Sequence, residues 1–594
     1  MTGYVPPLRD MQFVLQDVLD VDGVLRQLPA HADLNLELIQ QVLQEGGKFC
    51  SEVLYPLNAR GDREGCCYDP ATGAVRTPVG FKEAYAQFVE AGWPSLNCDP
   101  EHGGQGLPQI VKTSFQEMTT ACNQAWSMYP GLTHGVSEIL RAHGTEEQKA
   151  LYLRQLVVGE WAGTMCLTEP HCGTDLGLLR TRAEQVADGS YRVTGSKIFI
   201  TSGEHDFTPN IIHMVLARLP GAPAGTRGIS LFLVPKFLLD AEGRPGVRNG
   251  VRCSGIENKM GIHASPTCQM AFDGATGWLV GEPHQGLKAM FVLMNVARLG
   301  VGTMSLGLME TAYQASVAYA RERLQMRALS GPQAPELAAD PIIVHADVRR
   351  MLLTQRAYLE GSRALAYWAA LLTDVGERHV DLVQRKQAED LLTLLTPVVK
   401  AFISDAACEC TNLAVQVYGG HGYIVESGVE QLVRDARINP IYEGTNGIQS
   451  LDLLGRKVLA DGGVRMKVFG QLVQQFAQAH KDSEPMREFL APLEATGALV
   501  MACSLQIGAR SMENRDEVGA AAVDYLRLFG HYVYAYLWAR MAQASLGRGD
   551  DPFYAAKRVT ARFYVQRLLP ETQMLAARIQ AGGKNLFEMH ADQF

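Results

Sequence analysis

The sequence predicts an α+β protein in which a helical region, a β region and a helical bundle follow one another, with a further helical region at the end. Apolar residues recur at helical spacing before about residue 160 and again after about residue 285, and short β-branched or aromatic runs lie between. A chain of 594 residues is too long for one hydrophobic core. We expect an N-terminal extension (1–34), a helical N-terminal domain (35–160), a β-barrel or sheet domain (161–283), a C-terminal helical bundle (284–461) and an additional helical domain (462–594).

The first domain reads as helical because its apolar residues are spaced about 3.6 residues apart. Ile39 and Leu43 belong to one such stripe, and Phe81 and Tyr85 belong to another. The Gly- and Pro-rich stretch 103–108 is expected to separate two helices.

The middle domain has a different sequence pattern, in which short apolar runs are bounded by Gly, Pro and Asp. These runs are 191–193, 198–201, 211–216, 229–234 and 270–272. Because such runs are rich in β-branched and aromatic residues, they predict strands of an antiparallel sheet or barrel.

Helical periodicity returns after the β region and persists to the end of the chain. Leu287, Met290 and Met294 form one amphipathic stripe, and the runs 352–359 and 525–529 predict further helices. The final region needs a partner surface for its apolar positions, so we expect it to pack on the preceding bundle.

Composition excludes several classes of protein. The content of 47% hydrophobic and 20% charged residues is that of a folded globular protein, and a net charge of −9 gives no overall attraction to nucleic acid. No secretory signal and no run of 18 uninterrupted apolar residues is seen, so we expect a cytoplasmic protein without a membrane span. The twelve cysteines are scattered, and neither Cys66-Cys67 nor Cys408-Glu409-Cys410 has a second ligand pair, so no metal site is expected.

Two segments about 270 residues apart carry the functional signal. The first is 166–175 (CLTEPHCGTD) and the second is 434–445 (RDARINPIYEGT). The chain from about Gly80 to Lys457 resembles the acyl-CoA dehydrogenase family, and its length and the stretch 443–449 resemble the four-domain bacterial subgroup of long-chain, broad-range or methylthiopropionyl-CoA dehydrogenases. This resemblance implies FAD-dependent α,β-dehydrogenation of an acyl-CoA thioester to a trans-2-enoyl-CoA. It also implies the predicted order of domains.

Glu443 is the predicted catalytic base. Pro440 before it and Gly444 after it indicate a sharp connection between two helices, which can aim a carboxylate into a pocket. Burial beside an apolar acyl chain would raise the pKa of such a carboxyl towards the value that proton abstraction requires. Some relatives place the base just before the position of Arg298, but Ala297 stands there and cannot serve. The competing interpretation is a solvated loop glutamate.

The flavin-side segment and the later stretch 195–203 (GSKIFITSG) supply the predicted contacts to the isoalloxazine ring and phosphates. An ordinary turn at Pro170 and Gly173 fits the composition of the first segment as well. The resemblance assigns the following residues to these contacts: Met165, Leu167, Thr168, Gly173, Thr174, Phe199 and Thr201. An aromatic residue such as Phe199 can wall the ring, although many strand aromatics are plain core.

A second set of cofactor contacts is implied across a subunit boundary. By resemblance, Arg323 reaches the FAD pyrophosphate of a neighbouring subunit, and Gln325 is a further cofactor contact. Gln416, Gly419 and Gly420 are expected to meet the adenosine of the partner's FAD. A guanidinium suits paired phosphates, but a helix-surface salt bridge is the alternative for this arginine. The two glycines could equally be a helix terminator.

The remaining predicted contacts lie around the catalytic loop and the substrate. Thr445 is expected near the flavin phosphates at a helix start, where free N–H groups favour anions. Tyr442, Gly444 and Thr174 are expected at the acyl thioester, and Asn295 with Arg298 at the CoA.

Electron transfer and assembly follow from the resemblance. We expect an electron-transfer flavoprotein as acceptor and a homo-oligomer, in particular a dimer. An acyl-CoA oxidase that reduces O₂ would use the same base and flavin. A DNA-associated flavoprotein on this scaffold is a third alternative, but residues 461–594 carry 15 Lys and Arg against 14 Asp and Glu, too balanced a charge for duplex binding.

Overall fold

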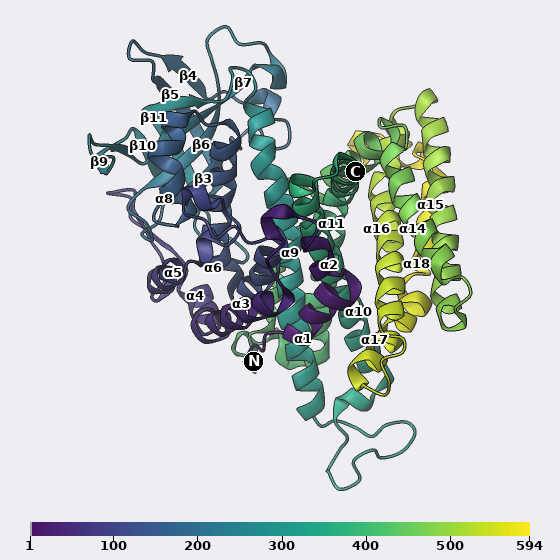
Figure 1. The fold of residues 1–594 in the computed structure, drawn as a ribbon. Coiled ribbons are helices and arrows are strands. Elements are labelled where there is room, and N and C mark those ends of the chain that lie inside the picture. Colours follow the sequence, from purple (N-terminus) through teal and green to yellow (C-terminus); the bar gives the residue numbers. More distant parts are fainter. Residues whose placement is uncertain (1–2) are drawn as a thin grey trace. The chain divides into compact units, whose positions relative to one another are not determined.

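The computed structural model describes residues 3–594, which form two compact units. Unit 1 comprises the residues up to Gly47 together with Pro108–Ala121 and Val301–Phe594. Unit 2 comprises Lys48–Leu107 and Cys122–Gly300. The chain passes between the units within the long helices α6 (Gln109–His143) and α9 (Gly286–Glu322) (Figure 1). The boundaries of the five predicted domains stay a prediction.

The sheet of unit 2 closes on itself. Strands β11, β5, β4, β6 and β7 form a ring in which β7 pairs with both β6 and β11, while β10 and β3 extend it at either side. The bounds are β3 Ala162–Cys166, β4 Arg182–Gln185, β5 Tyr191–Thr201, β6 Ile211–Arg218, β7 Ile229–Pro235, β10 Val251–Ile256 and β11 Thr267–Val280. The predicted β-barrel or sheet domain is therefore confirmed, but the expected antiparallel pairing is wrong at β6, which pairs in parallel with β3 and β4.

Strands β6 and β7 are buried on both faces, which explains why their sequences are continuously apolar. Val215 and Phe232 join a core made by the other strands of the ring. The alternate residues Met214 and Leu231 instead join a core that includes residues of α6 and the start of α9.

The rest of unit 2 precedes or links these strands. Its helices are α4 (Tyr55–Glu64), α5 (Phe81–Glu90), α7 (Glu146–Gln148) and α8 (Arg154–Val157). Two short hairpins are also present, β1 (Cys67–Tyr68) with β2 (Val75–Arg76) and β8 (Phe237–Leu239) with β9 (Pro245–Arg248). The first hairpin lies inside the region that the sequence predicts as helical.

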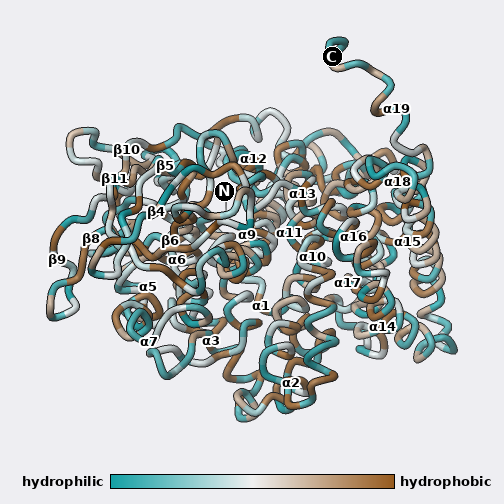
Figure 2. Tube along the Cα trace, turned by 90° about the horizontal axis from the view of Figure 1, so that it is seen from above, coloured by the Kyte–Doolittle hydropathy of each residue, from teal (hydrophilic) through white to brown (hydrophobic). Residues whose placement is uncertain are grey.

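Unit 1 is built around long helices. The central pair is α10 (Ala346–Arg378) and α11 (Leu382–Tyr418), followed by the short helices α12 (Val429–Ala436) and α13 (Asn446–Leu451). The later helices are α14 (Val464–His480), α15 (Arg487–Glu513), α16 (Asp516–Ala544), α17 (Pro552–Phe563), α18 (Glu571–Ala581) and α19 (Lys584–Phe587). Figure 2 shows α19 and the C-terminus standing apart from α18.

The C-terminal helices pack on the central pair, as the sequence predicts. Helix α16 contacts both α10 and α11. The hydroxyl of Tyr534 lies 2.5 Å from that of Ser362, and a Cβ atom at Gly530 would overlap the ring of Phe402. Glycine at position 530 therefore permits the close approach of α16 and α11.

The N-terminal extension is also docked. Helices α1 (Leu8–Gln12) and α2 (Val21–Leu25) and the π-helical turn Phe13–Val18 precede α3 (Leu36–Phe49). Asp10 pairs with Lys557 and Asp17 with Arg548, so the two ends of the chain are joined inside unit 1.

Among residues 3–594, three helical stretches are long and apolar enough to cross a bilayer, by length and composition only: Gly286–Glu322, Leu382–Tyr423 and Glu484–Glu513. The absence of a membrane span remains a prediction.

Candidate functional site

The loop that follows β3 is organised around the buried carboxylate of Glu169. This carboxylate accepts hydrogen bonds from the main-chain N–H groups of Arg180 (2.7 Å) and Thr181 (3.0 Å) and from the Thr181 hydroxyl (2.6 Å). Burial opposes its charge, but the Lys197 ammonium and these donors together lower the pKa of Glu169 to about 2. The carboxylate is therefore ionised at neutral pH and fixes the course of the loop.

Lys197 joins the two predicted flavin segments. Its Nζ lies 2.8 Å from Glu169 and also donates to the carbonyl of Leu167 at 2.9 Å. Nearby, the N–H of Ile198 donates to the carbonyl of Thr168 at 2.9 Å. The predicted flavin segments 166–175 and 195–203 thus form one structure within unit 2.

Several of the residues predicted to contact the flavin are at least partly exposed to solvent. Thr168, Met165 and Thr201 are half-buried, Gly173 and Thr174 are exposed, and Leu167 is buried. Phe199 is 59% exposed and has a φ of 59°. Left-handed backbone is unfavourable for a bulky side chain by about 1–2 kcal/mol. An exposed aromatic ring in such a conformation is more consistent with a binding surface than with core packing.

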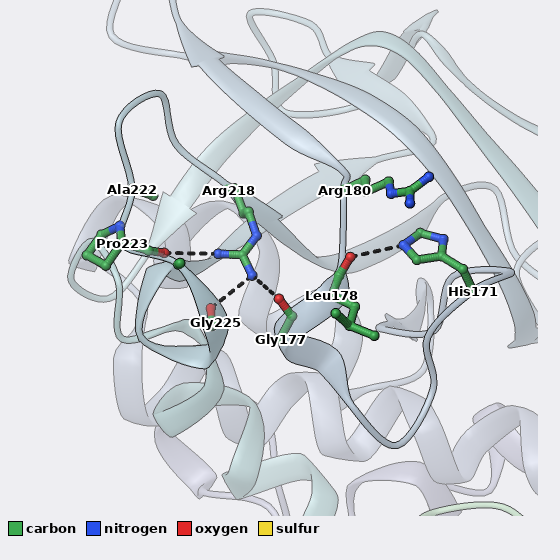
Figure 3. Close-up of a pocket in the computed structure, with 9 residues that line it drawn as sticks. His171, Gly177, Leu178, Arg180, Arg218, Ala222, Pro223 and Gly225 are labelled. Carbon is green, nitrogen blue, oxygen red and sulfur yellow. Dashed lines mark hydrogen bonds between the residues drawn. The ribbon is translucent and has the colours of Figure 1, made fainter.

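A pocket of about 600 Å³ lies beside this loop in unit 2 (Figure 3). Arg218 shapes it, since its guanidinium donates to the carbonyls of Leu179, Pro223, Gly177 and Gly225 at 2.6–3.1 Å. Because Arg218 is fully engaged, the exposed Arg180 is the guanidinium available to a ligand there. This pocket was not predicted from the sequence, in which the one signal for it is the Gly/Pro-rich stretch 220–225 after an apolar strand.

One group of potential metal ligands occurs among residues 3–594. The ligand atoms of Glu169, His171 and Cys172 lie within 4.8 Å of one another. Glu169 is already committed to Lys197 and Thr181, so this group has an evident structural role. The absence of a metal remains a prediction.

The predicted CoA contacts lie on the part of α9 that belongs to unit 2. Asn295 is exposed, whereas Arg298 is only 7% exposed. The Arg298 guanidinium carbon lies 6.0 Å from the ring centre of Phe291.

The predicted catalytic loop, residues 442–444, belongs to unit 1 and has an unusual backbone. Glu443 has a φ of 58° and Gly444 a φ of 84°, so two successive residues are left-handed. The Tyr442 hydroxyl donates to Oδ1 of Asn439 at 2.9 Å, and the Asn439 amide donates to the hydroxyl of Ser305 at 2.9 Å. The loop is therefore anchored before Glu443, whose side chain is half-buried.

The helix that follows this loop begins at an exposed residue, Thr445. The Thr445 hydroxyl accepts the N–H of Ile448 at 3.3 Å, which caps α13. Asn446 then anchors the helix, because its Oδ1 accepts from the buried Lys400 ammonium (2.8 Å) and its amide donates to Asp405 (2.7 Å).

The residues predicted to contact a neighbouring subunit occur where α9 and α11 end. The rings of Tyr319 and Tyr418 stack at 4.0 Å, and the Tyr319 hydroxyl lies 3.2 Å from Nδ1 of His421. Arg323 lies one turn after Tyr319, is exposed, and makes no side-chain hydrogen bond or ion pair within residues 3–594. The salt-bridge interpretation of this arginine is therefore not supported.

The adjoining residues are exposed as well. Gln416, Gly419 and Gly420 are exposed at the end of α11, and Gly419, with a φ of 59°, does terminate that helix. Gln325 is exposed at the start of a long loop. The buried carboxylate of Asp340 holds that loop by accepting the N–H groups of Ala328, Gln333 and Ala334 at 2.8–3.0 Å.

Family models match the chain in four consecutive parts. Those for the acyl-CoA dehydrogenase N-terminal, middle and C-terminal domains match residues 39–160, 164–275 and 284–459. An acetyl-CoA dehydrogenase C-terminal-like model matches residues 469–590. The chain belongs to the acyl-CoA dehydrogenase family, whose members are flavoprotein oxidoreductases acting on acyl-CoA.

Several relatives match the chain over its full length. It is 41% identical to 3-methylmercaptopropionyl-CoA dehydrogenase of Ruegeria pomeroyi, over 98% of this chain and 99% of that protein. It is 36% identical to the broad-specificity linear acyl-CoA dehydrogenase FadE5 of Mycobacterium tuberculosis, over 96% of each. A butyryl-CoA dehydrogenase of Syntrophomonas wolfei is 34% identical over 96% of this chain and 95% of that protein.

Solved structures agree on the fold. Caenorhabditis elegans ACDH-11 in complex with C11-CoA has a TM-score of 0.78 at 19% identity, covering 100% of this chain and 97% of that one. A Bacillus anthracis acyl-CoA dehydrogenase complexed with FAD has a TM-score of 0.75 at 20% identity, covering 96% and 91%. The four-domain architecture is thus the one that the sequence predicts.

Proposed function

We propose that this enzyme converts an acyl-CoA thioester to the trans-2-enoyl-CoA, with Glu443 as the base that removes the α-proton. The observation that carries the proposal is the loop 442–444. There a carboxylate-bearing residue is held in left-handed backbone between an anchored tyrosine and a glycine. Such a loop on packed helices presents a carboxylate in one fixed direction, as abstraction of a weakly acidic proton requires.

The exposed and half-buried residues of the predicted flavin segments fit a flavin dinucleotide. Phe199, Thr168 and Thr201 offer an aromatic face and two hydroxyl groups of the kind that bind an isoalloxazine ring, and Thr174 offers a hydroxyl for phosphate. When bound, FAD supplies the acceptor for the β-hydride, which no side chain can provide. The chain's own residues hold the ring and the thioester, and Glu443 holds the proton that leaves Cα.

The unengaged Arg323 supports a cofactor shared between two copies of the chain. A guanidinium without an internal partner is suited to paired phosphates, and the stacked Tyr319 and Tyr418 lie one turn away. We therefore propose a homodimer in which Arg323, Gln325 and the end of α11 contact the FAD of the partner subunit. Tyr442, Gly444, Asn295 and Arg298 would contact the substrate.

The substrate class is an acyl-CoA, and the relatives' names suggest which acyl groups to test. One relative is named for a thioether acyl group, one for linear acyl chains and one for butyryl-CoA. Since a methylene in an apolar pocket changes binding by about 1–3 kcal/mol, a series of chain lengths will separate these possibilities.

The electron acceptor follows from the class of the relatives, which are named dehydrogenases. We propose an electron-transfer flavoprotein as acceptor, with O₂ as the alternative of an oxidase, and a cytoplasmic location. No DNA binding is expected from the balanced charge of residues 461–594.

The test uses the purified protein with its cofactor. We expect a yellow protein with about one FAD per chain, whose visible absorbance bleaches when an acyl-CoA is added anaerobically. The series should run from butyryl-CoA to a long-chain acyl-CoA and include 3-methylmercaptopropionyl-CoA. No bleaching with any of these thioesters would contradict the proposal, and reoxidation rates with O₂ and with an electron-transfer flavoprotein would identify the acceptor.

A further inference from the structure

The backbone at Glu443 needs support from elsewhere in unit 1. A non-glycine residue in left-handed backbone is disfavoured by about 1–2 kcal/mol, and Glu443 is followed by a second left-handed residue, Gly444. Without an external contact the loop would relax, and the direction of the carboxylate would change. The question is therefore which group holds the two peptide units.

Gln449, in the first turns of α13, makes the relevant contacts. Its Nε2 lies 3.3 Å from the carbonyl oxygen of Glu443 and 3.4 Å from that of Gly444, and both carbonyls accept from it. The side chain is completely buried. One amide group thus bridges two consecutive carbonyls of the catalytic loop.

The oxygen end of the Gln449 amide shows that contacts with the loop determine the orientation of this amide. Oε1 of Gln449 is buried and receives no hydrogen bond within residues 3–594. A buried acceptor without a donor costs about 1–3 kcal/mol. Rotating the amide would place Oε1 against the two carbonyl oxygens, which is worse because three acceptors would then meet. Oε1 of Gln449 therefore stays without a donor, because Nε2 faces the two carbonyls of the loop.

Two neighbouring features keep Gln449 in place. Asn446, at the start of the same helix, is fixed by Lys400 and Asp405 of α11. At Gly444 a Cβ atom would lie only 2.8 Å from Nε2 of Gln449, so a larger residue would push the amide away. The helix anchor and the close approach at Gly444 both restrict the position of the amide.

We propose that Gln449 is a positioning residue for the reaction: it holds the peptide units of Glu443 and Gly444 so that the Glu443 carboxylate points at the α-proton. This inference rests on the proposed role of Glu443 as the base. Gln449 itself makes no contact with the reacting atoms in this scheme. Its loss therefore affects the chemical step more than the binding of FAD or acyl-CoA.

The first test replaces the donor while keeping the shape of the side chain, in Gln449→Met. In the FAD-loaded enzyme, anaerobic stopped-flow flavin reduction should slow about 10- to 100-fold, since a base displaced by about 1 Å loses this much rate. FAD content and the Kd for acyl-CoA should stay within about two-fold of wild type. Gln355→Met is the matched control, because Gln355 is equally buried and donates to a main-chain carbonyl within α10. The control should reduce its flavin at the wild-type rate even if its Tm falls.

The second test changes Gly444, the residue on the other side of the contact with Gln449. Gly444→Ala should slow flavin reduction, and Gly444→Ala combined with Gln449→Met should be little slower than the worse single variant, because both remove one contact. Should Gln449→Met fail to fold, Gly444→Ala with FAD retained decides the matter. Wild-type rates in either folded variant, or multiplicative losses in the pair, would overturn the inference. A wild-type enzyme that no acyl-CoA bleaches would instead overturn the proposed function.

Discussion

The ammonium group of Lys197 lies 2.8 Å from the carboxylate of Glu169, and the two side chains are only 0% and 3% exposed. This buried pair connects strand β5 to the loop after β3. It therefore fixes the relative position of Thr168 and Phe199, on which the proposed flavin site depends. Removing one partner of a buried pair leaves an uncompensated charge, which is far more costly than losing an exposed pair.

Lys197→Met should therefore destabilise the enzyme by about 3–5 kcal/mol and lower its FAD content. Urea unfolding at pH 7 and the FAD-to-protein absorbance ratio would measure both effects. Lys149→Met is the control, since Lys149 pairs with a Glu146 side chain that is 90% exposed, and its loss should cost less than about 1 kcal/mol. Equal losses for the two variants would show that Lys197 has no special structural role.

The Lys197–Glu169 pair also makes the stability of the enzyme depend on pH. The pKa of Glu169 is about 2 in the folded enzyme, against an ordinary value of 4.5, because Lys197 and Thr181 outweigh the opposing effect of burial. The stabilisation is therefore complete above about pH 5 and is lost as pH falls towards 2, which amounts to about 3 kcal/mol. Unfolding of wild type and Glu169→Gln should differ most at pH 7 and converge by about this amount near pH 2. A constant difference across that range would contradict the assignment.

Sequence reasoning predicted the elements whose signal is local. The apolar runs that form β6 and β7 are continuous because both faces of these strands are buried. Such a run can be recognised in the sequence without knowing which strand it pairs with. Pro440 and Gly444 predict a connection between two helices at Glu443, and residues 437–445 do form a loop of turns and bends between α12 and α13.

Interactions between distant residues were not predictable in this way. A lysine in a strand usually faces solvent, and the burial of Lys197 depends on a carboxylate 28 residues away in the sequence. The contact of Asp10 with Lys557 spans almost the whole chain, so no local pattern could predict where the N-terminal extension docks. The left-handed backbone of Glu443 and Phe199 was also hidden, because residue type argues against it.

Replacing the proposed base isolates the proton-transfer step. Glu443→Gln should retain FAD and bind acyl-CoA but reduce its flavin about 10²- to 10⁴-fold more slowly, since an amide cannot accept the α-proton. Anaerobic stopped-flow absorbance with a good substrate measures this rate. Glu426→Gln, at an exposed position on the same unit, should leave the rate unchanged. Retention of more than about a tenth of the wild-type rate would place the base elsewhere.

The proposed cross-subunit contact predicts a selective loss of cofactor. Arg323→Met should weaken FAD binding by about 10- to 100-fold, because charge-assisted hydrogen bonds to phosphate contribute about 1.5–3 kcal/mol each. The stability of the apoprotein should hardly change, since this guanidinium has no partner within residues 3–594. FAD titration of the apoprotein, followed by flavin fluorescence, gives the Kd. Arg321→Met, two residues earlier and equally exposed, is the control, and an equal effect of both variants would indicate a general charge effect.

Docking of the C-terminal helices can be tested with two glycines of α16. Gly530→Ala should destabilise the enzyme and disturb its assembly, because the added Cβ would overlap the ring of Phe402 on α11. Gly519→Ala lies on the same helix with no atom within 4 Å of the added Cβ, so it should stabilise the helix by about 0.5–1 kcal/mol. Thermal unfolding and size-exclusion chromatography would compare the two.

Truncation after Lys457 extends the same reasoning, since it would uncover the surfaces of α10 and α11 on which α16 packs and should yield aggregated protein. A soluble truncated enzyme with unchanged oligomeric state, FAD content and kcat/KM would show that these helices are an independent appendage, whatever the stability of Gly530→Ala.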